Sequence, residues 1–430
     1  MLTLSKKAQA MPASPIRKLV PFADAAKKRG IKVYHLNIGQ PDIASPKEAL
    51  DAVKNNKLKV VEYAKSGGND SLREGLARYY KGIGINVEAA DINITNGGSE
   101  ALQIALSVTC DPDDEVIVFE PFYTNYNSFA LQNDVKLVPI TTHIEDGFAL
   151  PPMSEVEKHI SPKTKGVVIC NPGNPTGCLY TKEALLELGE IARKHGLFIF
   201  ADEVYREFCY TDAPHFSCMH IPGLEQNVIL LDSVSKRYSL CGARIGYLVS
   251  RNKEVMAAVM RYAQARLCSP SYGQIAAEGA LDAPASYFKA VRDEYIHRRD
   301  VLIDGLKNAL NTNGTATRNA AERFVQFAGG SAMPETDAYG HSAVSGLPLG
   351  LYLVVETSVP EMVTSTTNPF LVSLPMTSVN GSNADDGGGR WIYNAVLYPK
   401  NCTGIPTLEK TLRPWLPGGS FEDVDITSGD

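Results

Sequence analysis

The chain has 430 residues, of which 44% are hydrophobic and 21% are charged, and its formal net charge is -6. This length exceeds one ordinary core, so we expect two or more domains. The acidic balance excludes the basic surface that binding to nucleic acid or to an anionic membrane requires.

The absence of targeting segments and the spacing of the cysteines indicate the location of the protein and argue against a metal site. No apolar run reaches the length of a membrane span, and the first residues lack the apolar stretch of a secretory signal, so we expect a cytoplasmic protein. The eight cysteines include no C-x-x-C pair, which argues against a zinc site or a dithiol centre. We therefore expect no metal.

The first 308 residues alternate helix and strand signals in chain order. Ser14-Pro15 opens an amphipathic stretch that stops at Gly30, and Ser45-Pro46 opens another, because each pair supplies a cap and a first-turn proline. Helical stretches such as 181–195 separate short apolar runs that are typical of strands buried on both faces of a sheet. These runs are 115–119, 166–170, 197–201 and 228–232. The pattern predicts a doubly wound α/β fold with a mainly parallel sheet.

The character of the chain changes near residue 310, after a long charged helix expected from about 285 to 310. Residues 309–430 hold 6 Lys and Arg against 12 Asp and Glu, whereas the preceding residues hold 36 of each. The later apolar runs are bounded by turn residues, and no convincing helix separates them, which predicts an all-β module. We place a boundary near 308–314, abrupt enough to suggest a join between unrelated sequences.

Two of the buried runs end in candidate catalytic groups. Ser233-Val-Ser-Lys236 follows one run, and Arg244 lies eight residues beyond the lysine. The S-x-x-K spacing also opens the active site of penicillin-binding serine enzymes, but their S-D-N and K-T-G triplets are absent. Asp202 and Tyr205 end another run. A buried carboxylate there either keeps a facing ring nitrogen protonated or caps the next turn.

Three further segments offer binding groups. The string Asn171-Pro-Gly-Asn-Pro-Thr-Gly177 makes a rigid turn after a strand, and a purely structural turn would not need all of it. Asn96-Gly-Gly-Ser99 precedes a helical stretch whose free backbone N–H groups suit a phosphate. Tyr123 either stacks on a flat ligand or belongs to the core.

Together these segments resemble the class I and II aminotransferases of pyridoxal 5'-phosphate (PLP) fold type I, in family order over residues 30–250. The resemblance implies that Lys236 holds PLP as a Schiff base and that Asp202 meets the ring nitrogen. It implies that Tyr205 and Asn174 meet the ring oxygen and that Tyr123 stacks on the ring face. Lys236, Asp202 and Tyr205 are then the catalytic residues.

The same resemblance assigns the remaining positions. Ser233, Arg244, Gly98 and Ser99 are implied to bind the phosphate. Tyr63, in Glu62-Tyr-Ala-Lys-Ser-Gly67, matches the tyrosine that reaches the phosphate of a neighbouring subunit, which implies a homodimer.

On the substrate side, the resemblance places two residues, Gly39, in Asn37-Ile-Gly-Gln-Pro-Asp42, and Asn174. The implied partners are an amino acid and a 2-oxo acid, between which an amino group moves. Lys236, once freed, would move the α-proton as a base. The sequence leaves the substrate side chain open, with aspartate or another common amino acid as the suggestion of the resemblance.

The expected domain organisation follows this family. We expect an arm and part of the small domain in 1–45, a large PLP-binding domain in 46–285, a long helix in 286–310, and the β module in 311–430. The family's small domain is then incomplete. It lacks the R-[IV]-[SA]-[FY] strand whose arginine grips the substrate carboxylate, because none of the tail's arginines has that context; they are Arg318, Arg323, Arg390 and Arg413. We expect impaired turnover for that reason.

The tail resembles the N-terminal domain of a Gram-positive, sortase-assembled pilin backbone subunit. The resemblance rests on 346–357, 369–375 and Trp391-Ile-Tyr-Asn-Ala-Val-Leu-Tyr-Pro-Lys-Asn401, and it makes Lys400 the polymerisation lysine. No LPxTG sorting signal or anchor accompanies it. The sequence therefore leaves three functions open: an aminotransferase, a PLP-dependent lyase of the same fold, and a pilus structural fragment. We interpret the whole as a chimera.

Overall fold

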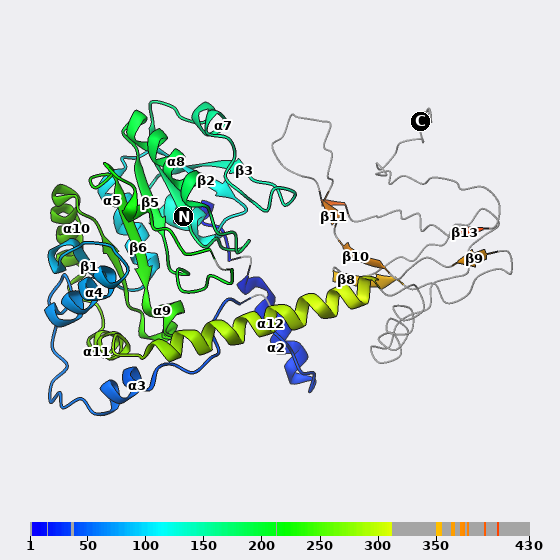
Figure 1. The fold of residues 1–430 in the computed structure, drawn as a ribbon, viewed down its shortest axis with the longest axis horizontal. Coiled ribbons are helices and arrows are strands. Elements are labelled where there is room, and N and C mark those ends of the chain that lie inside the picture. Colours follow the sequence, from blue (N-terminus) through cyan, green and yellow to red (C-terminus); the bar gives the residue numbers. More distant parts are fainter. Residues whose placement is uncertain are drawn as a thin grey trace. The chain divides into compact units, whose positions relative to one another are not determined.

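The computed structural model describes residues 2–14, 16–35, 38–211 and 213–311, together with six short strands between Gly350 and Thr403 (Figure 1). The chain divides into two compact units, residues 1–296 and 297–430. The first unit is built on one seven-stranded sheet in the order β1-β7-β6-β5-β4-β2-β3. Its strands are β1 (Ile92–Thr95), β2 (Glu115–Glu120), β3 (Lys136–Thr141), β4 (Thr164–Cys170), β5 (Phe198–Asp202), β6 (Val228–Ser233) and β7 (Gly246–Val249).

The sheet is mainly parallel, as the sequence predicts. Strands β3, β2, β4, β5 and β6 pair in parallel, whereas β7 runs antiparallel to both β6 and β1. Strand β1 therefore runs in the same direction as these five, and all six strands from β1 to β6 end at one edge of the sheet, where the doubly wound arrangement places its ligand sites.

Successive side chains along each strand point to opposite faces of the sheet, and this explains why the four apolar runs are continuous. On β2, Ile117 and Phe119 contribute to one buried cluster, while Val116 and Val118 contribute to a second cluster on the other face. Because side chains alternate between the two faces of a strand, a sheet covered on both faces needs apolar residues at every position.

Helices cover both faces of the sheet (Figure 1). One core contains residues of α5, α6 and α10, and the other contains residues of α3, α4, α8 and α11. The helices are α1 (Lys6–Ala10), α2 (Val20–Lys28), α3 (Lys47–Lys54), α4 (Asp70–Gly82), α5 (Gly98–Thr109), α6 (Asn125–Gln132), α7 (Met153–Lys158), α8 (Lys182–His195), α9 (Val234–Arg237), α10 (Lys253–Arg266), α11 (Ser271–Ala280) and α12 (Ala285–Asn311).

The predicted helix boundaries agree closely with the observed ones. The stretch from Ser14 to Gly30 contains a 3-10 turn and α2, and α3 begins just after Pro46. The cap expected at Ser45 is wrong, because Pro46 is the N-cap residue and the Ser45 hydroxyl donates to the Ser239 carbonyl oxygen instead. For α8, the Thr181 hydroxyl accepts a hydrogen bond from the Ala184 N–H at 3.1 Å, and Gly196 ends the helix in the left-handed conformation. Both ends of α8 are therefore fixed by local sequence.

The N-terminal arm is anchored to the first unit at several points. Lys7 pairs with Asp134 at 2.5 Å, and the Ser45 hydroxyl donates to the Ser239 carbonyl oxygen at 2.9 Å. The Ala44 carbonyl oxygen accepts from the Tyr287 hydroxyl at 3.1 Å. The last two contacts hold Ala44 and Ser45 against α12 and the segment that follows α9.

Beyond α12, the described elements are strands that form three antiparallel pairs, β8 with β10, β11 with β12, and β9 with β13. They are β8 (Gly350–Val354), β9 (Val363–Ser365), β10 (Phe370–Leu374), β11 (Met376–Thr377), β12 (Trp391–Ile392) and β13 (Cys402–Thr403). Strands β8 and β10 coincide with two predicted apolar runs. The all-β module as a whole stays a prediction, as do the bounds of the four expected domains.

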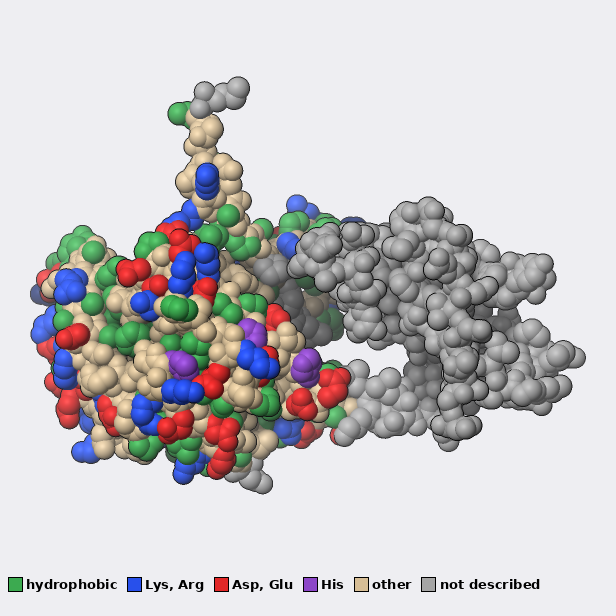
Figure 2. All heavy atoms as spheres, turned by 90° about the horizontal axis from the view of Figure 1, so that it is seen from above, with side chains coloured by type: hydrophobic (Ala, Val, Ile, Leu, Met, Phe, Trp, Pro, Cys, Tyr) green, Lys and Arg blue, Asp and Glu red, His purple; other side chains and the backbone are tan. Residues whose placement is uncertain are grey.

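The surface agrees with the charge balance of the sequence. Figure 2 shows acidic and basic side chains interspersed on the visible face of the part that the structure describes. Within that part, no helix is both long and apolar enough to cross a membrane.

Candidate active site

The edge at which the parallel strands end collects most of the predicted site residues. Lys236 lies in the single-turn helix α9 directly after β6, and Asp202 is the last residue of β5. Asn174 lies in the turn after β4, Tyr123 follows β2, and Gly98 opens α5 after β1. Segments that are far apart in sequence thus converge because parallel strands share their carboxyl edge.

Lys236 is a half-buried amine at the centre of this edge. Its Nζ donates a hydrogen bond to the Gly39 carbonyl oxygen at 2.6 Å and lies 5.8 Å from the centroid of the Tyr205 ring. Burial lowers the pKa of Lys236, while Cys241 and Asp202 act in the opposite direction. A lower pKa makes the neutral, nucleophilic form of the amine more available.

Asp202 is the acid of the site. Burial raises its pKa to about 6, and two hydrogen bonds oppose that rise. The Tyr126 hydroxyl donates to Oδ2 at 2.6 Å, and the Val204 backbone N–H donates to Oδ1 at 3.4 Å. The carboxylate form therefore depends on donors that the protein itself supplies.

Asn174 and Tyr205 form a pair beside the lysine. The Asn174 side-chain amide donates to the Tyr205 hydroxyl at 3.3 Å. Burial raises the pKa of Tyr205 well above its ordinary value, so the phenol keeps its proton and can act as a donor. The peptide bonds before Pro172 and Pro175, on either side of Asn174, are both cis.

The start of α5 forms an anion cradle with Arg244. The Arg244 guanidinium donates to the Asn96 carbonyl oxygen at 3.2 Å and to the Cys241 carbonyl oxygen at 3.1 Å. A Cβ on Gly246 would overlap the backbone of Gly97 and Gly98, so only glycine lets β7 approach the helix start this closely. Gly98 and Ser99 are the first two residues of α5, where free N–H groups and the helix dipole favour an anion.

Ser233 is almost fully buried, and its hydroxyl accepts a hydrogen bond from the Ser235 N–H at 3.1 Å as the cap of α9. A hydroxyl that accepts can still donate its own proton. Ser233 therefore anchors the turn that carries Lys236 and keeps a donor available.

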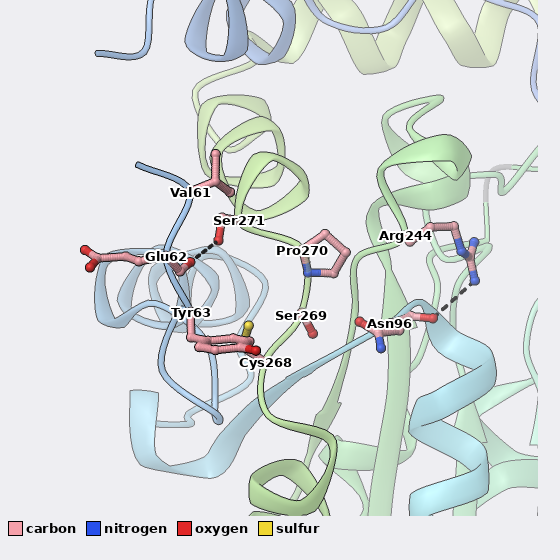
Figure 3. A pocket seen from close by; sticks show the side chains of 9 residues that line it. All are labelled: Val61, Glu62, Tyr63, Asn96, Arg244, Cys268, Ser269, Pro270 and Ser271. Carbon is pink, nitrogen blue, oxygen red and sulfur yellow. Dashed lines mark hydrogen bonds between the residues drawn. The ribbon is translucent and has the colours of Figure 1, made fainter. Parts of the chain in front are cut away.

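A pocket of about 700 Å³ opens beside Arg244 (Figure 3). Figure 3 shows Arg244 and Asn96 on one side and Tyr63 on the other, with Cys268, Ser269 and Pro270 between them. The Tyr63 side chain is 78% exposed. Its position leaves the phenol accessible to a second copy of the chain, and its contact with a neighbouring phosphate stays a prediction.

Tyr123 lies within this edge, as predicted. Its hydroxyl accepts from the Asn125 amide at 2.7 Å, and its ring meets the Tyr126 ring edge-on, with centroids 5.5 Å apart. Burial raises the pKa of Tyr123, and Arg244 and Arg17 act against that rise. Stacking of this ring on a ligand stays a prediction.

Tyr126 is a site residue that the sequence patterns missed. It lies in the first turn of α6, and its phenol reaches Asp202 across 76 positions of sequence. The only sequence signal is the aromatic spacing in Phe122-Tyr-Thr-Asn-Tyr126, which does not reveal a partner on another strand.

The remaining predicted positions lie elsewhere. Lys400 and the four tail arginines, Arg318, Arg323, Arg390 and Arg413, lie outside the described residues. Within the described ranges, no cluster of His, Cys, Asp or Glu could hold a metal ion.

Known proteins resemble both parts of the chain. Residues 31–340 match the family model described as aminotransferase class I and II. The aspartate/prephenate aminotransferase of Thermus thermophilus is 30% identical over 371 residues, which cover 80% of this chain and 94% of the relative. The arginine–pyruvate transaminase of Pseudomonas aeruginosa is 29% identical, with 77% of this chain and 88% of the relative covered.

Solved structures of aminotransferases are also similar to this chain. The structure of Thermus thermophilus aspartate aminotransferase with maleate superposes with a TM-score of 0.67 at 30% identity, over 71% of this chain and 81% of the other. Residues 291–402 match a second family, described as the N-terminal domain of Gram-positive pilin subunit D1, and this match overlaps the first over residues 291–340.

Proposed function

This chain belongs to the class I and II aminotransferase family, and we propose that Lys236 carries its PLP cofactor in the site described above. The observation that carries the proposal is the environment of Lys236. A half-buried amine with a lowered pKa faces Tyr205 at the edge where Asp202, Asn174 and the cradle at Arg244 converge. Perturbed ionisable groups that converge at one strand edge are typical of active sites.

The residues present fit PLP. Gly97 has a φ of 81°, and a Cβ on it would overlap the Arg244 guanidinium, so only glycine lets this cation lie against the backbone that leads into α5. A phosphate needs such an approach to free N–H groups and a cation. Arg244, Gly98, Ser99 and Ser233 would hold it.

The remaining site residues would hold the pyridine ring of the cofactor. Asp202 would face the ring nitrogen, Tyr205 and Asn174 the ring oxygen, and Tyr123 the ring face. When bound, PLP supplies the electron sink for bond cleavage at the α-carbon of an amino acid. Burial lowers the pKa of Lys236, which favours its neutral form, and this amine would take the α-proton and return it in the second half of the reaction.

For the substrates, we propose only a chemical class and not a single amino acid. The named relatives act on different amino acids, aspartate in one case and arginine in another, so family membership leaves the side chain open. We propose an amino acid and a 2-oxo acid, with aspartate as the first to assay. A cytoplasmic location stays a prediction.

The experiment is an assay of the purified full chain with PLP. Transfer of the amino group from aspartate to 2-oxoglutarate supports the proposal, whereas release of ammonia and pyruvate from a substrate such as cysteine would favour the lyase alternative. Lys236→Met should abolish transfer, because no other residue can replace the amine. Lys158→Met, at an exposed lysine paired with Glu155, is the matched control and should leave transfer unchanged.

A specific observation favours a second function for the tail. Residues 291–402 match the pilin family, which supports the proposal that this part derives from a pilus backbone subunit, with Lys400 as its linkage lysine. The chimera hypothesis predicts a junction in the gene. Long-read sequencing across codons 300–320 tests it, and one uninterrupted frame with recovery of the intact protein would contradict an assembly artefact.

A further inference from the structure

The phenol of Tyr126 is held rigidly against Asp202. The Tyr126 side chain is 2% exposed, and its ring is stacked with Phe122, with centroids 6.2 Å apart and planes at 11°. Tyr123 meets the same ring at 86° on another side. Packed between two aromatic rings, the hydroxyl cannot swing away from the Asp202 Oδ2 atom, to which it donates at 2.6 Å.

The two oxygens of Asp202 are used unequally. Oδ2 accepts the short bond from Tyr126, whereas Oδ1 accepts only a long bond of 3.4 Å from the Val204 N–H. A carboxylate offers about four acceptor positions, so Oδ1 keeps acceptor capacity that the protein does not use. That oxygen is free for a donor that comes from outside the protein.

We propose that Tyr126 is a positioning residue, which orients Asp202 through Oδ2 and reserves Oδ1 for the protonated ring nitrogen of the cofactor. This inference rests on the proposed function and deepens it. Tyr126 touches neither cofactor nor substrate in this arrangement, and it acts only through the carboxylate.

The charges around Asp202 explain why such a donor is needed. Burial, the carboxylate of Asp232 on β6 and the adjacent carboxylate of Glu203 all raise the pKa of Asp202. Lys236, from α9, is the nearby cation whose own pKa responds to Asp202, and its Nζ donates to the Gly39 carbonyl oxygen instead. The hydrogen bonds that favour the ionised carboxyl come from Tyr126 and Val204.

Two weakly acidic groups complete this environment. Tyr205 on the following turn and Cys170 on β4 both have pKa values raised by burial, so both remain neutral near pH 7. The pKa of Tyr126 is itself raised well above its ordinary value, first by burial and then by Asp202. The phenol therefore stays a donor throughout the range in which Asp202 titrates.

The test measures PLP affinity by equilibrium dialysis from pH 5 to pH 9, with the cofactor-free full chain. Wild-type affinity should fall as the pH drops through the pKa of Asp202. Tyr126→Phe removes the donor to the carboxylate, so the midpoint of that fall should move to higher pH by about one unit or more. Ionisations of PLP itself are common to all variants and cancel in the comparison.

Tyr79→Phe is the matched control. The Tyr79 hydroxyl also donates to a carboxylate, that of Glu207, which is not among the groups that shift the pKa of Asp202. Its loss removes a comparable bond and should leave the midpoint where it is in the wild type. A role of Tyr126 that is only structural would instead leave both midpoints unchanged, and that result would overturn the proposal.

A second probe keeps the shape of the side chain. Replacement of Tyr126 alone by 3,5-difluorotyrosine makes the phenol a stronger donor, so the midpoint should move to lower pH. This variant answers the question even if Tyr126→Phe does not fold, because an unmoved midpoint in the fluorinated protein also contradicts the proposal. Failure of the wild type to bind PLP at any pH would instead refute the proposed function.

Discussion

At the scale of residues, burial shifts the two central groups toward the same pH range. It lowers the pKa of the Lys236 amine and raises the pKa of the Asp202 carboxyl to about 6. Desolvation disfavours the charged form of each group, so a single cause produces opposite shifts. A lysine with a lowered pKa gives up its proton more readily, which suits it to act as a base.

The raised pKa of Asp202 has a consequence for stability. Because the pKa is about 6 in the folded protein, against an ordinary value of 3.8, the folded protein binds the extra proton between these limits. This contribution to stability is fully present below pH 3.8 and is lost as the pH rises through 6. We expect cofactor-free Asp202→Asn to unfold at a higher urea concentration than the wild type at pH 7.5.

The same comparison at pH 5 should show a smaller difference, since Asp202 is then mostly protonated. Urea midpoints of both proteins at the two pH values are the measurement. A difference that does not change with pH would contradict the raised pKa.

Local motifs predict most of the site residues, because each follows a strand that can be recognised by itself. Lys236, Asp202 and Asn174 lie at the ends of buried runs, as predicted, and the parallel sheet then brings them together. Tyr126 could not be predicted in this way. Its role depends on the distance to a carboxylate on another strand, which no local pattern encodes.

At the scale of elements, the apolar runs predict β2, β4, β5 and β6, which are buried on both faces. Three other strands carry weaker patterns. Strand β1 includes the polar Asn93, β7 has only four residues and begins with glycine, and β3 is an edge strand with Lys136 and Pro139. Their places in the sheet are set by long-range pairing rather than by local sequence.

Because β7 approaches α5 so closely, we expect Gly246 to tolerate no larger side chain. Gly246→Ala would push its Cβ into the backbone of Gly97 and Gly98, which cannot move without opening the cradle. Overpacking of this kind costs about 1–3 kcal/mol, so we expect a loss of PLP affinity of about tenfold or more. PLP affinity and the midpoint of thermal unfolding are the two measurements.

Gly242→Ala is the control for that substitution, because nothing lies within 4 Å of a Cβ at Gly242. Its affinity and stability should equal those of the wild type. Equal affinities of the two alanine variants would show that the approach of β7 does not shape the cradle.

At the scale of the whole molecule, the exposure of Tyr63 is consistent with the homodimer that the sequence predicts. Val60, Val61, Tyr63, Leu267 and Tyr272 are all large apolar side chains that are exposed in the single chain. If Tyr63 completes the site of a second subunit, a hybrid of Tyr63→Ala and Lys236→Ala chains contains one intact site. Co-expressed variants should then bind PLP at a low concentration that neither variant binds alone.

No gain in binding from co-expression, with a dimer confirmed by light scattering, would show that Tyr63 acts within its own chain. A monomer would contradict the shared site directly.

The two family matches also bear on how far the reaction can proceed. The pilin match begins at residue 291, within α12, and overlaps the aminotransferase match over residues 291–340. The tail contains no arginine in the family's carboxylate-binding context. We therefore expect the chain to bind PLP normally while turnover with aspartate is reduced by about 100-fold or more relative to a family member that has the arginine.

The central claim is that Lys236 carries the cofactor, and one measurement tests it most directly. The full chain is incubated with PLP, reduced with borohydride and digested, and the modified lysine is located by mass spectrometry. We predict one stably modified peptide, which contains Ser233 to Arg237 with the added mass on Lys236. Modification spread over exposed lysines, with Lys236 unmodified, would contradict it.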